Sequence, residues 1–372
     1  MTNNESRTVL RILDANFNRA GEGLRTLEES ARFILDDPSL SDALKTHRHD
    51  LSEAMKCWDR LQLISARDTP GDVGTELQTA SEQTRVNLHS VVSAAAVRTQ
   101  QALRCLEEYG KTIDAAFANK IETLRYRCYA TFQSLELRIA NQRHRAIRIR
   151  ASRLYALIDC EQSVERFESR IRELASVGVD VLQLRDRSVD DRTLFERAEV
   201  GTKLTEELGL LWIINDRADI AMAARADGVH VGQEELPVDA ARQVVGPDRL
   251  IGLSTHDMEQ VREASQTTAD YIGCGPTFPG RTKNFDHFPG CEFLSQVHQA
   301  TRSGEINLPA FAIGGISASN IREVAATGIA RVAVTGALAS GEQLPDAASK
   351  MRAALEANPL TIDVGEKGVR EP

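Results

Sequence analysis

The sequence predicts an all-α domain followed by a closed eightfold β/α barrel. From residue 9 to about residue 148, apolar residues recur at helical spacing, and no convincing strand pattern interrupts them. From residue 154 to residue 358, eight short β-rich apolar runs alternate with helical segments. This alternation is typical of a TIM-type barrel, with an open doubly wound sheet as the alternative. The expected domains are therefore residues 1–150 and 151–358, with a flexible tail at 359–372.

The composition is that of an ordinary globular protein and excludes several classes of partner. The 372 residues are 42% hydrophobic and 27% charged, and the formal net charge of −9 argues against nucleic acid as a partner. The basic segment 143–153 has no interleaved aromatic residues that could stack on bases. The polar start MTNNESR does not resemble a secretory signal, and no apolar stretch is long enough to span a membrane. We therefore expect a cytoplasmic protein with reduced cysteines and no membrane partner.

Four helices are expected in the first domain, over residues 8–36, 40–65, 82–109 and 113–148. A four-helix bundle is the simplest way to pack them. The segment RAGEGLRTLEESAR, which begins at Arg19, aligns with RTQQALRCLEEYGK, which begins at Arg98. Both contain Arg, then Leu-Arg, then Leu-Glu-Glu, then a basic residue. This match indicates two copies of a helical hairpin about a pseudo-twofold axis, although shared helical spacing could produce part of it.

The first expected helix carries a polar stripe whose members lie three or four residues apart. Its members are Asp14, Asn18, Glu22, Arg25 and Glu29. Such a stripe is either a surface ladder of ion pairs or the wall of a polar pocket or subunit interface. For the pocket, the candidate residues are Asp14, Asn18, Glu22 and Arg25, with the loop 67–75 as the opposite wall. A homo-oligomer remains possible on this basis.

Eight strands are expected in the second domain, each followed by a helix or a loop. They begin at Leu154, Val179, Leu211, Gly228, Leu250, Asp270, Pro309 and Arg331. In a β/α barrel the chemistry lies at the carboxyl ends of the strands, so the residues that follow each strand are the candidate site residues.

Acidic residues follow the third and fourth expected strands. Asp216 comes directly after LWIIN, and Glu235 lies four residues beyond GVHV. Because parallel strands end at the same rim, we expect the two carboxylates to lie close together. Two oxygen ligands of this kind suit Mg²⁺, which usually keeps waters and substrate phosphates as its other ligands. The alternative is that each carboxylate only caps the helix that follows it.

Basic and glycine-rich segments on the same rim predict an anionic ligand. Gln183, Arg185 and Arg187 alternate after the second strand, so they should point to one side. Asn215 and Ser254 end the third and fifth strands, and the loop GCGPTFPGRTKNF after the sixth carries Thr282 and Lys283. That loop is either a phosphate-binding lid or a plain crossover. The glycines in AIGGIS and VTGAL, after the last two strands, predict a phosphate site, whereas His230 and Cys274 are interpreted as packing residues.

Five segments of the barrel resemble the thiamine-phosphate synthase family: QLRDR, INDRADIAMAARADGVHVGQEE, GLSTH, GPTFPGRTK and AIGGI. The resemblance covers about 154–358. It implies that 4-amino-2-methyl-5-(diphosphooxymethyl)pyrimidine is joined to a thiazole ethyl phosphate with release of diphosphate. The implied ligands of the pyrimidine diphosphate are Gln183, Leu184, Arg185, Asp186, Arg187, Asn215, Ser254 and Lys283. The implied ligands of the thiazole phosphate are Gly280, Arg281, Thr282, Gly315, Thr335 and Gly336.

The resemblance also implies the cofactor and the catalytic groups. Asp216 and Glu235 correspond to the magnesium ligands, and Arg185, Arg187 and Lys283 would stabilise the departing diphosphate together with Mg²⁺. The family usually has Lys at 187, Asp at 235 and Thr at 280, so this chain departs from it at three positions. Each departure keeps the charge or shrinks the side chain, so the resemblance still implies the activity. A phosphate-sugar isomerase or aldolase is the alternative for the barrel.

Two segments of the first domain, DANFNRAGEGLR and RDTPGDVGT, resemble a helical module that is fused ahead of this synthase in some bacteria. The resemblance implies a hydroxymethylpyrimidine-phosphate kinase, although no nucleotide-binding motif supports that role. The alternative is a non-catalytic dimerisation or channelling module.

Overall fold

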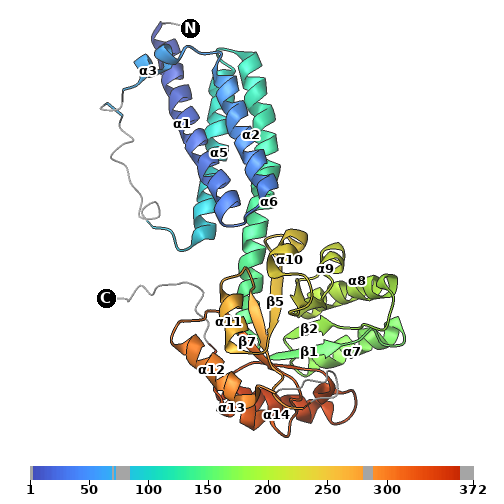
Figure 1. The fold of residues 1–372 in the computed structure, drawn as a ribbon. Coiled ribbons are helices and arrows are strands. Elements are labelled where there is room, and N and C mark those ends of the chain that lie inside the picture. Colours follow the sequence, from blue (N-terminus) through green and yellow to red (C-terminus); the bar gives the residue numbers. More distant parts are fainter. Residues whose placement is uncertain (1–2, 69–70, 73–83, 280–287, 361–372) are drawn as a thin grey trace. The chain divides into compact units, whose positions relative to one another are not determined.

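The computed structural model describes residues 3–68, 71–72, 84–279 and 288–360 (Figure 1). The chain separates into two compact units, residues 1–141 and 142–372. The first unit is helical, and the second contains a closed barrel of parallel strands in the order β1 to β8. The predicted fold class is therefore confirmed.

The helical unit is built from long amphipathic helices around a leucine-rich core. Leu13, Leu24, Leu103 and Leu106 are completely buried in it. Figure 1 shows α1, α2, α5 and the first part of α6 packed as a bundle. The helices are α1 (Asn3–Phe33), α2 (Pro38–Met55), α3 (Arg60–Ala66), α5 (Leu88–Gly110) and α6 (Ala115–Ala151).

The helix expected over 40–65 is two helices, α2 and α3. α2 ends at Met55, and the side chain of Asp59 accepts a hydrogen bond from the backbone N–H of Leu61 at 3.1 Å. An aspartate in this position begins a new helix. Trp58, in the break, packs edge-on against Phe117 with ring centroids 5.8 Å apart. The aromatic contact and the new cap together explain the interruption.

An ion-pair ladder joins the two helices of the first hairpin. On α1, Arg25 lies 3.5 Å from Glu28 and 2.9 Å from Glu29. Glu28 is buried, and it also accepts a hydrogen bond from Arg48 of α2 at 2.9 Å. Arg25 is thus part of the architecture of this hairpin.

The second hairpin repeats the ladder, with Arg104, Glu107 and Glu108 at the positions aligned with Arg25, Glu28 and Glu29. On α5, Arg104 lies 2.8 Å from both Glu107 and Glu108. Glu107 is buried and accepts a hydrogen bond from Arg125 of α6 at 2.7 Å. Repetition of a buried carboxylate with its two arginines goes beyond shared helical spacing, and it supports an internal duplication.

The closest approach of α1 to α5 depends on a glycine. A Cβ atom added at Gly23 would lie 2.0 Å from Oγ1 of Thr99, which is itself buried and bonded to the carbonyl of Ala95. Any side chain at this position would therefore push the two helices apart.

The barrel strands alternate with helices that cover their outer face. The strands are β1 (Leu154–Ile158), β2 (Val181–Leu184), β3 (Leu211–Asn215), β4 (Gly228–Val231), β5 (Leu250–Thr255), β6 (Tyr271–Cys274), β7 (Ala310–Ile313) and β8 (Val332–Val334). The helices are α7 (Val164–Ser176), α8 (Asp191–Leu208), α9 (Ala218–Ala223), α10 (Val238–Val245), α11 (Met258–Ser265), α12 (Gly290–Arg302), α13 (Ile321–Ala326), the 3₁₀ helix η1 (Gly336–Leu338) and α14 (Leu344–Glu356).

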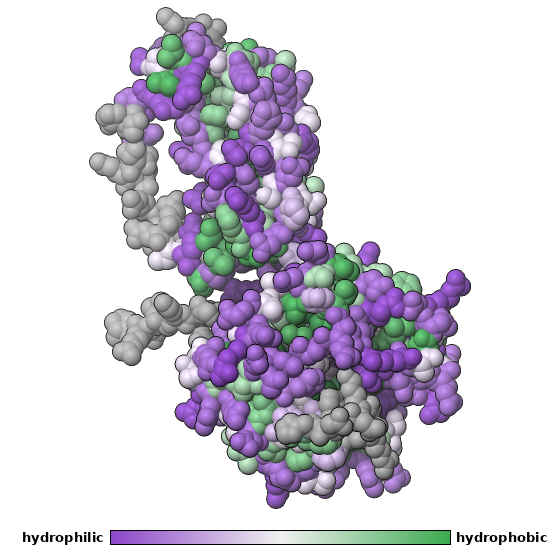
Figure 2. All heavy atoms as spheres, viewed as in Figure 1, coloured by the Kyte–Doolittle hydropathy of each residue, from purple (hydrophilic) through white to green (hydrophobic). Residues whose placement is uncertain are grey.

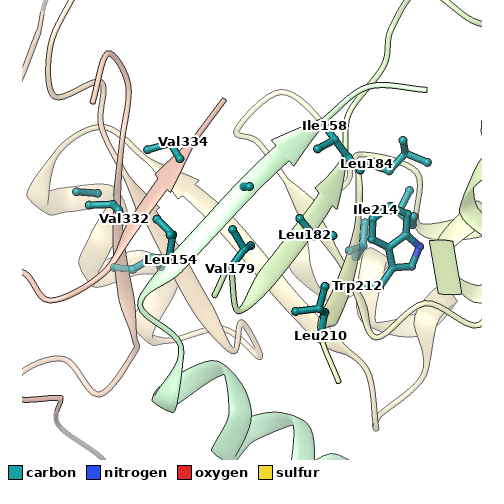
Figure 3. Close-up of a cluster of buried hydrophobic side chains, with 14 of the residues drawn as sticks. Leu154, Ile158, Val179, Leu182, Leu184, Leu210, Trp212, Ile214, Val332 and Val334 are labelled. Atoms are coloured by element: carbon teal, nitrogen blue, oxygen red, sulfur yellow. The ribbon is translucent and has the colours of Figure 1, made fainter. Parts of the chain in front are cut away.

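Each strand contributes to two separate apolar layers because its side chains alternate. Leu182, Trp212 and Ile214 lie in the outer layer between strands and helices, part of which Figure 3 shows. Tyr155 and Phe311 belong to the inner cluster that fills the barrel. Ile149, near the end of α6, is part of this inner cluster, so the last turns of α6 belong to the barrel unit. The predicted domain limits at 150 and 358 stay a prediction.

Three aspartates fasten the amino-terminal rim of the barrel. Asp180, Asp227 and Asp270 come just before β2, β4 and β6, and each accepts a hydrogen bond from a backbone N–H at the start of the preceding strand. The donors are Leu154, Trp212 and Ile251, at 2.9, 3.0 and 2.8 Å. Each aspartate also pairs with an arginine: Arg352, Arg145 and Arg242. These contacts hold neighbouring strands in register at the rim opposite the expected site.

In the part of the chain that the structure describes, no helix is long and apolar enough to cross a membrane. The face shown in Figure 2 is mostly hydrophilic, with small apolar patches.

We expect Gly23→Ala to lower the free energy of unfolding of the helical unit by about 1 to 3 kcal/mol, because the new methyl group overpacks the contact with Thr99. Gly21→Ala is the matched control, since a Cβ there meets nothing within 4 Å. It should stabilise the same helix by up to about 1 kcal/mol. Hydrogen exchange of α1 and α5 measures both effects, and equal exchange in the two variants would contradict this packing.

Candidate active site

A cavity of about 630 Å³ opens at the carboxyl-terminal rim of the barrel. This volume is typical of small-molecule sites. Among the residues predicted from sequence, those that line it are Gln183, Arg185, Arg187, Asn215, Asp216, Glu235, Ser254, Gly315, Thr335 and Gly336. The predicted residues Gly280, Arg281, Thr282 and Lys283 lie outside the described part of the chain.

Two of the predicted ligands, Leu184 and Asp186, point away from the cavity. Gln183 lies inside the barrel, so the alternation of β2 puts Leu184 in the outer apolar layer. Asp186 accepts hydrogen bonds from the backbone N–H of Cys160 at 3.2 Å and from Ser188. Leu184 and Asp186 are therefore not lining residues of this cavity, and their assignment as ligands stays a prediction.

Arg187 joins the two carboxylates that sequence analysis assigns to a metal. Its Nη2 atom lies 2.7 Å from Oδ2 of Asp216 and 2.9 Å from Oε1 of Glu235. Both oxygens contact the same nitrogen, so the two carboxylates converge on one point. The hydrogen bond that Arg187 donates to Asp216 is the largest cause that raises the pKa of Arg187, so the guanidinium stays charged.

Asp216 is held in an unusual backbone conformation. Its φ angle is 62°, in the left-handed region, and its N–H donates a hydrogen bond to the carbonyl of His230 at 2.8 Å. A non-glycine residue in this region costs free energy, and such residues cluster at functional sites. The conformation directs the carboxylate toward Glu235 across the ends of β3 and β4.

The carboxylate pair suits a cation that needs few protein ligands. In the described ranges, no group of three or more His, Cys, Asp or Glu residues could hold a metal ion. A structural zinc site would need four such ligands, whereas Mg²⁺ binds through one or two carboxylates and keeps waters and phosphate oxygens. The donor set of Asp216 and Glu235 therefore fits Mg²⁺ bound together with a phosphate ligand.

The floor of the cavity is a hydrogen-bonded network of polar side chains. Nε2 of Gln183 donates to the hydroxyl of Tyr155 at 2.7 Å, and this hydroxyl lies 3.1 Å from that of Tyr271. His230 contacts the Tyr271 hydroxyl at 3.3 Å and Oγ of Ser254 at 3.0 Å. Burial raises the pKa of both tyrosines, so both stay protonated.

His230 and Tyr271 fit side by side because β5 has a glycine beside them. A Cβ atom at Gly252 would lie 2.2 Å from Cζ of Tyr271 and 2.3 Å from Nδ1 of His230. The sequence pattern indicated neither ring as a site residue, and it favoured a packing role for His230. The alternation of side chains along each strand could have identified them, because every second residue of β4 and β6 faces the inside of the barrel and both rings occupy such positions.

The glycine-rich ends of β7 and β8 form another wall of the cavity. Gly315 has a φ of 63°, and a Cβ there would lie 2.6 Å from the carbonyl oxygen of Phe278. The side chain of Asn320 donates to the carbonyl of Gly315 at 2.9 Å and fixes this turn. Thr335 and Gly336 complete the wall at the start of η1.

The helical unit has a smaller cavity of about 220 Å³ beside α1. Its lining residues are Arg11, Asp14, Ala15, Asn18, Arg67, Asp68 and Asp72. The guanidinium of Arg67 donates two hydrogen bonds to the carboxylate of Asp14, at 2.5 and 2.9 Å. The cavity thus combines two of the four residues predicted for the pocket, Asp14 and Asn18, with the start of the predicted loop.

Two members of the predicted pocket, Glu22 and Arg25, are not among the lining residues of this cavity. Arg25 is turned toward Glu28 and Glu29 in the ion-pair ladder. The stripe is therefore part cavity wall and part ladder, and the assignment of Glu22 and Arg25 to a pocket stays a prediction.

Comparison with known proteins gives the same division of the chain. Residues 154–338 match the family described as thiamine monophosphate synthase, and residues 11–134 match the ThiD2 family. A thiamine-phosphate synthase from Rhodopirellula baltica is 67% identical, over 97% of this chain and 96% of that protein. One from Nostoc punctiforme is 39% identical, over 91% of each chain. A solved thiamine phosphate pyrophosphorylase from Pyrococcus furiosus is 30% identical with a TM-score of 0.49, and covers 57% of this chain and 98% of that one.

Proposed function

The chain belongs to the thiamine-phosphate synthase family, and we propose that its reaction takes place in the cavity at the carboxyl-terminal rim of the barrel. The activity is a transferase reaction of thiamine biosynthesis. It condenses 4-amino-2-methyl-5-(diphosphooxymethyl)pyrimidine with a thiazole ethyl phosphate and releases diphosphate. The observation that carries the proposed site is the convergence of Asp216 and Glu235 beside two arginines of the same rim.

The carboxylate pair is the proposed magnesium site. Asp216 and Glu235 would hold Mg²⁺, which when bound would neutralise part of the diphosphate charge. Arg185 and Arg187 line the same cavity and carry the positive charge that the leaving diphosphate needs. Lys283 keeps its proposed role in this step, although it lies outside the described residues.

The polar floor is the proposed site of the pyrimidine ring. Gln183 and His230 offer hydrogen-bonding groups to an uncharged ring that itself has an amino donor and ring-nitrogen acceptors. Asn215 ends β3 and Ser254 is the last but one residue of β5, and both line the cavity. A ring on the floor would therefore present its methylene carbon toward the charged mouth.

The glycine-rich wall is the proposed site of the thiazole phosphate. Gly315, Thr335 and Gly336 line the cavity where a backbone can approach a phosphate group closely. Gly280, Arg281 and Thr282 are assigned to the same phosphate as a proposal from the sequence. The two substrates would then meet between the floor and this wall.

The bond changes need no protein nucleophile or general base. The carbon–oxygen bond to the diphosphate breaks with its electron pair on the leaving group, and the thiazole nitrogen lone pair forms the new carbon–nitrogen bond. The arginines stabilise the negative charge that develops on the leaving group. A Schiff-base aldolase would need a lysine in the cavity, and none of the described lining residues is a lysine.

The cavity of the helical unit is the proposed ligand site of the first domain. Arg25, Glu28 and Glu29 recur in the second hairpin, whereas Asp14 and Asn18 align there with Ser93 and Val97. The helical hairpin therefore folds without a polar pair equivalent to Asp14 and Asn18. A pyrimidine phosphate kinase and a dimerisation or channelling module remain the two proposals for this domain.

The proposed location is the cytoplasm, because all six cysteines are free thiols, as a reducing compartment favours. A homo-oligomer is also retained as a proposal.

An assay of the full chain tests the proposed site directly. Thiamine phosphate formation would be followed with both substrates, with magnesium and after its removal by a chelator. Activity that is lost on chelation and restored by Mg²⁺ is expected. Unchanged activity after complete removal of divalent ions would overturn the metal assignment.

We expect Asp216→Asn and Glu235→Gln each to lower kcat by about 100- to 1,000-fold, with partial recovery at raised magnesium, because each removes one anionic ligand. Asparagine tolerates the left-handed backbone of residue 216, so the fold should survive. Asp219→Asn is the control, since Asp219 pairs with Arg217 and is not a lining residue. A wild-type magnesium response in the first two variants would contradict the site.

We expect Gln183→Met to raise KM for the pyrimidine diphosphate about 10- to 100-fold, because one buried hydrogen-bonding group is lost at similar volume. KM for the thiazole phosphate should change little. Steady-state kinetics with each substrate varied in turn gives both values. Equal changes in the two KM values would place the pyrimidine ring elsewhere.

We expect Asp14→Asn to abolish a ligand-induced slowing of hydrogen exchange in α1 of the full chain, because it breaks the grip of Arg67. The ligands tested are the pyrimidine alcohol, its monophosphate and ATP. Arg25→Met is the matched control from the same helix and should keep the effect. Absence of any slowing in the wild type at millimolar ligand would leave this domain a structural partner.

A further inference from the structure

Arg187 occupies the point that a metal ion at the rim would need. One atom, Nη2, contacts Asp216 at 2.7 Å and Glu235 at 2.9 Å. A divalent cation held by the same two oxygens would stand between them, where the guanidinium lies. Arg187 and the cation therefore exclude each other from the carboxylate pair.

The carboxylates need a positive charge even without a metal. The side chains of Asp216 and Glu235 are only 21% and 24% exposed, so their mutual repulsion is weakly screened. Another arginine of this rim, Arg217, is paired with Asp191 and Asp219 instead. Arg187 thus offsets one of the two negative charges of the pair.

Arg187 can leave this position without disturbing the core. Its side chain is 56% exposed, and it stands in the segment between β2 and α8. Asp216, in contrast, is fixed by its left-handed backbone and its bond to the His230 carbonyl. The carboxylates are the fixed partners, and the guanidinium is the movable one.

We infer that Arg187 is a placeholder for the metal ion, and that it moves from the carboxylates to the diphosphate when metal and diphosphate bind together. This inference rests on the proposed metal site at Asp216 and Glu235. Without diphosphate, a metal ion must displace two charge-assisted hydrogen bonds and leave the guanidinium unpaired. With diphosphate present, the guanidinium gains phosphate oxygens as new partners, so the two ligands favour each other's binding.

The test is direct binding of Mn²⁺ to the full chain, measured by electron paramagnetic resonance without any substrate. Arg187→Gln should bind Mn²⁺ about tenfold more tightly than the wild type, because the competing guanidinium is gone. Arg187→Lys keeps the positive charge and should stay within about threefold of the wild type. Arg217→Gln is the matched control and should change the affinity by less than about twofold, since its charge is screened.

A further variant locates the effect. Adding Asp216→Asn to Arg187→Gln should abolish the gain in affinity. A free-enzyme affinity for Mn²⁺ that is unchanged or weaker in Arg187→Gln overturns the placeholder, even if Asp216→Asn still weakens binding of Mn²⁺ with inorganic diphosphate. If Asp216→Asn weakens neither form of binding, the proposed metal site itself fails, and the inference fails with it.

Discussion

The carboxyl-terminal rim is organised by the need of two half-buried carboxylates for a positive charge between them. The closed barrel brings the segments after β2, β3 and β4 to one rim. Arg187 comes from the first segment, Asp216 from the second and Glu235 from the third, so one guanidinium ties three loops together. The left-handed backbone of Asp216 costs free energy, and the ion pairs of this cluster offset that cost. This cluster forms one side of the cavity, and the ends of β7 and β8 form another.

Charge at the mouth contrasts with a floor whose buried tyrosines are neutral. The hydroxyls of Tyr155 and Tyr271 are protonated and hydrogen-bonded inside the barrel, where an unpaired charge would be costly. Such a cavity suits a ligand with an uncharged polar ring at one end and an anionic group at the other. The opposite rim has a different task, because aspartates such as Asp180 and Asp227 bond to backbone N–H groups of neighbouring strands there. The contacts that fasten the strands thus lie at one end of the barrel, and the proposed site lies at the other.

The sequence was sufficient for the fold and for the residues that directly follow strands. Apolar runs located the eight strands, and Asp216 was recognisable because it comes straight after one of them. The sequence could not assign Leu184, since one residue of register decides whether a side chain faces the cavity or the outer layer. His230 was interpreted as packing because a single histidine in a strand does not indicate whether it faces the inside of the barrel or the surrounding helices. The pairing of Arg187 with two carboxylates depends on the positions of three loops, which no spacing along the chain encodes.

A crystal structure with Mn²⁺ and inorganic diphosphate would show whether Asp216 and Glu235 hold the metal that accompanies the diphosphate. Anomalous scattering would locate the ion independently of the protein atoms. We predict one Mn²⁺ peak about 2.1 Å from an oxygen of each carboxylate, as expected for an ion of this size, with diphosphate oxygens completing its shell and Arg187 turned to the diphosphate. An ion bound away from both carboxylates, with Arg187 still between them, would contradict the account.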